Sequence, residues 1–276
     1  MRSLLLAALL PAFLGAAPDA LQVVNPVISL SDDGVSAPAG TQYRGGDTLY
    51  FSCRIAHYGK SPEQRVQLEY SVQSFDPRGV PLTEIFKHEI AEEVAPQDKE
   101  WMPKISTEIG IPPAAPPGDY KITVGVEDEV AHTTASLDVP FQVRGRTVAA
   151  TDKLTVQNMR YYRGEDDTRP LDKPVYKAGD ALWVRFDVTG FKYGPGNRVD
   201  LSYVFSVLGA DGTALFTSPD PVVDQGESFY PRPYASGAFS IAVQSGVKPG
   251  EYAIGVKATD AVGNQSVMAK QPFTVQ

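Results

Sequence analysis

The sequence contains an internal repeat, in which residues of the first half recur at matching positions about 133 residues later. The register runs from residue 21 to residue 143 and loses only one residue, after which the offset is 132. Matched pairs include Tyr43 and Tyr176, Gly46 and Gly179, Arg65 and Arg198, Leu68 and Leu201, Tyr120 and Tyr252, and Phe141 and Phe273. The fold must therefore be one unit built twice, with domains predicted at residues 21–145 and 151–276.

Apolar residues alternate with polar ones within each copy, which is the period of a half-buried strand. One such run comprises Leu49, Phe51, Cys53 and Ile55, and its partner in the second copy comprises Leu182, Val184, Phe186 and Val188. Cys53 matches a phenylalanine, so we expect a buried and inert thiol. No window shows a helical period with capping residues.

Turn residues divide each copy into about seven short strands, a pattern typical of an antiparallel β-sandwich. The segments Pro117-Gly118-Asp119-Tyr120 and Pro249-Gly250-Glu251-Tyr252 look like a tyrosine corner before the sixth strand. On these residues the chain resembles the immunoglobulin-like and fibronectin type III-like modules of exported bacterial proteins. The resemblance implies an all-β fold of two tandem immunoglobulin-like antiparallel β-sandwich domains, and it says little about function.

The amino terminus has the layout of a secretory signal peptide. Met1, Arg2 and Ser3 precede an apolar run over residues 4–14, and small residues follow at positions 15–17. We therefore predict a signal peptide over residues 1–20 and a secreted or periplasmic protein. No later stretch is long and apolar enough for a transmembrane helix, so no integral membrane segment is expected after cleavage.

Charge and cysteine content exclude several classes of function. The formal net charge is -8, which disfavours binding to nucleic acid or to anionic membranes. A single cysteine excludes an intrachain disulfide framework and a cysteine-based zinc site. No phosphate-binding glycine loop, nucleophile elbow or His-Glu-x-x-His stretch is present, so neither an enzyme nor a cofactor is expected.

A metal site is the weaker interpretation of the polar loops. The immunoglobulin-like strand order would bring His57 near His132 and Asp128, a set of ligands that suits a transition metal. Asp128 and Asp260 could equally be structural hydrogen-bond acceptors at the end of the sixth strand. Further carboxylates lie in connections without the spacing of a calcium loop, namely Asp32, Asp33, Glu165, Asp166 and Asp167.

Aromatic residues in two loops of the second copy are the candidate binding residues: Phe191, Tyr193, Phe229, Tyr230, Arg232 and Tyr234. Tyrosine and arginine are enriched at binding hot spots. The same strand order would also bring these loops against the base of the first copy, where they would form the junction between the domains. The sequence leaves both interpretations open.

These observations predict a non-enzymatic exported binding or scaffold protein. It would recognise a protein or glycan partner through loops or strand edges held on a rigid frame. The alternative is a carbohydrate-binding unit, or a metal-dependent hydrolase that uses the histidine loops of the first domain.

Overall fold

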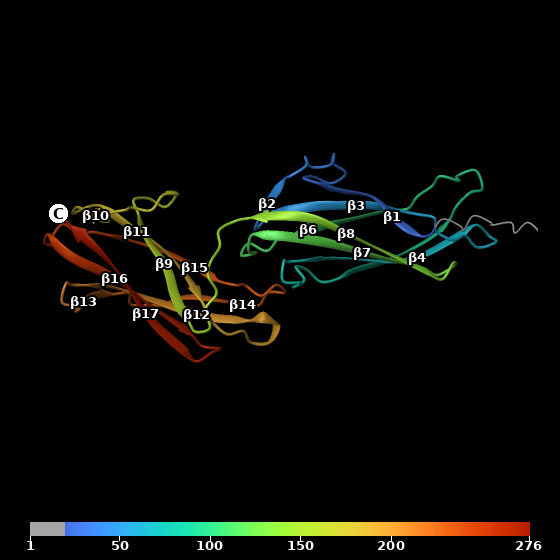
Figure 1. Ribbon diagram of the computed structural model, residues 1–276. Helices are drawn as coiled ribbons and strands as arrows, with labels where there is room; N and C mark the ends of the chain where they lie inside the picture. The colour runs from blue at the N-terminus through green and yellow to red at the C-terminus, as the bar shows by residue number, and fades with distance from the viewer. Residues whose placement is uncertain (1–19) are drawn as a thin grey trace, which may run out of the picture.

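Two β-sandwiches lie end to end in the computed structural model, which describes residues 20–276 (Figure 1). The predicted signal peptide lies outside the described residues, apart from Ala20. Between residues 20 and 276, no helix combines the length and apolar character needed to cross a membrane. The predicted all-β fold class is confirmed.

The first sandwich packs a three-stranded sheet against a five-stranded one. The smaller sheet has the order β1 (Gln22–Ser29), β3 (Thr48–Ala56) and β6 (Lys104–Gly110). The larger has the order β2 (Gln42–Arg44), β8 (Thr133–Arg144), β7 (Gly118–Asp128), β4 (Arg65–Phe75) and β5 (Phe86–Glu93). All neighbours are antiparallel except β2, which runs parallel to β8.

The second sandwich repeats this order. Its smaller sheet contains β15 (Ala235–Ala242), β11 (Ala181–Thr189) and β9 (Thr155–Tyr162). Its larger sheet contains β10 (Val175–Tyr176), β17 (Gln265–Val275), β16 (Gly250–Asp260), β12 (Val199–Leu208) and β13 (Ala214–Thr217), and β14 (Val222–Gly226) also pairs with β12. A short 3-10 turn, η1 (Pro195–Asn197), precedes β12. The short strands at the sheet edges raise the number above the seven predicted per copy.

Strand register shows that the repeat in the sequence is a repeat in space. Leu68 on β4 faces Asp128 on β7, and the matched Leu201 on β12 faces Asp260 on β16. Because a slip of one residue would turn every side chain to the other face, the shared register keeps the same positions buried in both copies.

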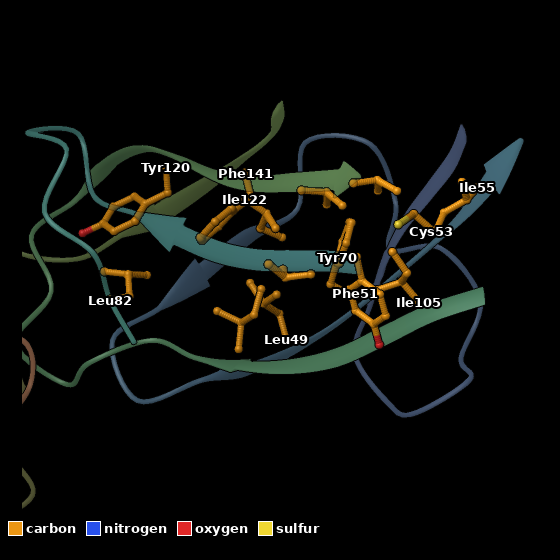
Figure 2. Packing of buried hydrophobic residues seen from close by; sticks show 14 of the residues in the cluster. Leu49, Phe51, Cys53, Ile55, Tyr70, Leu82, Ile105, Tyr120, Ile122 and Phe141 are labelled. Carbon is orange, nitrogen blue, oxygen red and sulfur yellow. The ribbon is translucent and has the colours of Figure 1, made fainter. Parts of the chain in front are cut away.

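The alternating residues form the core, as predicted. Leu49, Phe51, Cys53 and Ile55 lie between the two sheets of the first sandwich (Figure 2), and each is at most 1% exposed. The expected burial of Cys53 is confirmed, and burial raises the pKa of its thiol to about 12, which disfavours the reactive thiolate.

Both predicted tyrosine corners are present. The Tyr120 hydroxyl donates to the carbonyl of Pro116 at 2.6 Å, and the Tyr252 hydroxyl donates to the carbonyl of Lys248 at 2.8 Å. We call the end of each sandwich that holds this tyrosine its corner end. The corner end of the first sandwich faces the second sandwich, whereas that of the second lies near the C-terminus (Figure 1).

Candidate functional site at the junction of the two sandwiches

Tyr230 joins the two sandwiches. It belongs to the connection between β14 and β15 of the second sandwich, yet its ring packs in the core of the first and is 3% exposed. Its hydroxyl donates to Asp76 Oδ2 at 2.9 Å and accepts from Arg78 at 3.3 Å. Burial, assisted by the bond to Asp76, raises the pKa of Tyr230 to about 12, so the hydroxyl stays a neutral donor.

Asp76 is the acceptor that holds this tyrosine. The segment Asp76-Pro77-Arg78-Gly79 has the composition of a type I turn, and the Gly79 amide donates to the Asp76 carbonyl at 2.9 Å. The buried carboxylate also accepts from the amides of Arg78 and Val80, both at 2.8 Å. Burial opposes its charge, but these bonds and those from the Arg78 and Tyr230 side chains outweigh burial and lower the pKa of Asp76.

A second contact fixes the linker to the second sandwich. Arg146 lies just after β8 and forms a two-point ion pair with the buried carboxylate of Asp187 on β11. Ser236 and Asn158 also donate to this carboxylate. The Arg146 guanidinium lies 4.9 Å from the ring centre of Tyr234, within cation–π range.

A cationic hollow lies beside this linker. Its volume is about 430 Å³, and its lining includes Arg44, Arg144, Arg146 and Tyr234 and no acidic residue. Arg44 and Arg144 are brought together by the parallel pairing of β2 with β8, in which they are register partners. Neither is salt-bridged to any residue in the range 20–276. Guanidinium groups in such an arrangement suit carboxylates, which they can bind through two hydrogen bonds.

The structure divides the aromatic candidates into two groups. Phe191 and Tyr230 are buried, the former in the second core, so the protein itself holds both rings. Phe229 is 47% exposed and Tyr193 is 42% exposed. The two loops do emerge at the same end, because the Tyr193 hydroxyl donates to the carbonyl of Arg232 at 2.5 Å.

Two acidic residues at the ends of β7 and β16 hold nearby loops through backbone amides. Asp128 accepts from the amides of Gly59, Val130 and Ala131, and Asp260 accepts from Lys192 and Gly263 at matched positions. The interpretation of both residues as structural acceptors is confirmed. His57 and His132 lie on exposed loops, and nowhere in the described chain do three or more His, Cys, Asp or Glu side chains form a group that could hold a metal ion.

Sequence reasoning did not single out the arginine hollow. Arg144 and Arg146 were visible only as charges that interrupt the apolar pattern of the linker, and Arg44 carried no signal of its own. The missing information was the pairing of β2 with β8, since a three-residue edge strand has too little alternation to be predicted.

Comparison with known proteins adds little to this site. No protein-family model and no curated protein matches the chain. Among solved structures, the chain is similar to the C-terminal domain of the AgI/II polypeptide BspA of Streptococcus agalactiae, with a TM-score of 0.30 and 13% identity over 91% of this chain and 100% of that one. It is also similar to the C-terminal domain of the antigen I/II-family protein AspA of Streptococcus pyogenes, with a TM-score of 0.32 and 11% identity over 92% and 99% of the two chains. Scores this low carry no information about a site.

Proposed function

We propose that the protein is an exported, non-enzymatic binding protein that holds a partner bearing carboxylate groups at the junction of its two domains, residues 21–145 and 151–276. The observation that carries this proposal is the hollow of about 430 Å³ in which Arg44 and Arg144 have no ion-pair partner among the described residues, in a chain whose net charge is -8. A local cationic site on an acidic protein attracts an anionic partner against the field of the rest of the surface.

The junction supports binding because it fixes the groups that would make the contacts. The bond of Tyr230 to Asp76 joins the second sandwich to the first, and the ion pair of Arg146 with Asp187 joins the linker to the second sandwich. A site held in this way loses little conformational freedom when a partner binds. The exposed rings of Tyr193 and Phe229 offer further contact area on the adjoining loops, where Tyr234 lines the hollow and Arg232 is ion-paired with Asp224.

The partner would be a polypeptide or a glycan met outside the cytoplasm. The signal-peptide pattern of residues 1–20 supports a secreted or periplasmic location. The alternative of a metal-dependent hydrolase receives no support from the loops of the first sandwich, because Asp128 is engaged by three backbone amides there.

Binding of two polyanions with different backbones tests the proposal. Polyglutamate and polygalacturonate both present carboxylates, and we expect the purified chain to bind at least one of them. The affinity should fall as the salt concentration rises. The double variant Arg44→Gln/Arg144→Gln should lose about 100-fold in affinity, since each charge-assisted bond contributes about 1.5 kcal/mol.

A matched control carries the same change of charge away from the junction. Arg65→Gln/Arg169→Gln removes two exposed arginines that do not line the hollow. The proposal is contradicted if the affinity falls equally in the two double variants. It is also contradicted if the wild-type chain binds neither polymer. The polymer that binds more tightly indicates the class of partner.

A further inference from the structure

The second sandwich has an apolar cavity at its corner end. Its volume is about 600 Å³, within the range of sites for small ligands. Side chains from both sheets line it, including Leu182 and Ile241 from the smaller sheet and Val207, Phe216 and Phe273 from the larger. The cavity is therefore the space between the two sheets where the sandwich is not closed.

The first sandwich closes the corresponding space with its own chain. After β4 the chain forms an isolated bridge between Phe75 and Pro81, in which the Asp76 amide donates to Val80 and the Leu82 amide donates to Ser74. Leu82 then turns inward and is 3% exposed. The repeat places Ala214 at the position of Pro81, β13 stays paired with β12, and Leu215 is left 60% exposed.

The polar groups that hold Tyr230 in the first sandwich have no counterparts here. Gly209 stands at the position of Asp76, and Asp211 stands at the position of Arg78. An inserted tyrosine hydroxyl would thus lose the acceptor and the donor that it has in the first sandwich. The open corner end is not built for a second loop of the Tyr230 kind.

The lining contains a single charged residue, Lys248. The matched position in the first copy is Pro116, so this charge belongs to the open corner end alone. Lys248 is exposed and forms no salt bridge with any other part of the chain that the structure describes. An apolar space with one cation at its wall is complementary to a ligand with an alkyl chain and one negative charge.

We propose that this cavity binds a medium-chain fatty acid, with the alkyl chain between the sheets and the carboxylate at Lys248. This site is separate from the cationic hollow of the junction, so either assignment can fail without the other.

Calorimetric titration of the purified chain with dodecanoate, decanoate and dodecanol tests the assignment. We expect saturable binding of one dodecanoate per chain, about tenfold tighter than decanoate because two more methylene groups are buried. Leu215→Glu, which puts a charge at the mouth, should abolish binding, whereas Leu30→Glu, at an equally exposed leucine of the first sandwich, should leave it unchanged. Lys248→Gln should weaken dodecanoate about tenfold and leave dodecanol unaffected.

Three results overturn the proposal. One is the absence of saturable binding, and another is binding that persists in Leu215→Glu. The third is self-association of the wild-type chain that Leu215→Glu abolishes and dodecanoate does not displace, because this result assigns the cavity to a second copy of the protein. Both glutamate substitutions are at exposed positions, and an unchanged circular dichroism spectrum establishes that the variants are folded.

Discussion

The two corner ends show how one repeated unit acquires different properties. Leu49 and Leu182 occupy the same place in the two cores, and each is fully buried. At the corner ends the matched residues diverge, since Leu82 is buried and Leu215 is exposed. The first end is closed by its own leucine and by Tyr230 of the second sandwich, whereas the second is left open.

This contrast shows that the core and the ends of a duplicated sandwich are under different physical constraints. A core position is set by the alternation of its strand and by the opposite sheet, so both copies need the same kind of residue. The residues at the end of a sandwich are constrained instead by the part of the molecule that packs against that end. The first sandwich has Asp76 and Arg78 bonded to Tyr230 at its corner end, whereas the second has Gly209 and Asp211 at the matched positions.

The largest effect is expected from Tyr230→Ala. Removing this buried ring leaves a cavity in the first core and deprives Asp76 of a donor, so the free energy of unfolding of the first sandwich should fall by about 4 kcal/mol. Each sandwich contains one tryptophan, Trp101 in the first and Trp183 in the second. Guanidinium unfolding in a Trp183→Phe background therefore reports on the first sandwich alone.

The neighbouring residue supplies the control for that experiment. Phe229 is 47% exposed, and Phe229→Ala should change the free energy of unfolding by no more than about 0.5 kcal/mol. If the two alanine variants destabilise the first sandwich equally, Tyr230 does not close its corner end.

The matched leucines give the next largest difference. Leu82→Ala should cost about 3 kcal/mol, because the side chain is 3% exposed in the core. Leu215→Ala should cost less than about 0.5 kcal/mol, because its side chain is mostly in solvent. Urea unfolding of the two variants measures this difference, and similar losses would mean that the two corner ends are not distinct.

Acid should weaken the junction by a smaller amount. Hydrogen bonds lower the pKa of Asp76 in the folded chain, so its ionised form contributes stability above the unfolded pKa of about 4. That contribution is lost as the pH falls through the lowered folded pKa. Thermal unfolding of the first sandwich between neutral and strongly acidic pH measures the loss, and Asp76→Asn should make the dependence shallower. An unchanged slope in this variant would show that Asp76 does not control the acid response.

Most of the fold could be predicted from the sequence. For the junction, the sequence indicated which loops take part but not which of their residues is buried in the other sandwich. Alternation identified the core strands, and the Pro-Gly-x-Tyr segments identified both tyrosine corners, because both signals are local. The aromatic loops were recognised as a junction or a binding surface, but adjacent residues of one loop, Phe229 and Tyr230, have opposite surroundings. No local pattern distinguishes them.

Residue spacing alone predicted a duplicated sandwich, its buried strand faces and both tyrosine corners. These features follow from residue spacing within one strand or one turn. The folded structure was needed to show which tyrosine enters the other sandwich, where Arg44 meets Arg144, and which corner end stays open. Those outcomes depend on groups as far apart in the chain as Asp76 and Tyr230, and contact between such distant groups leaves no periodicity in the sequence.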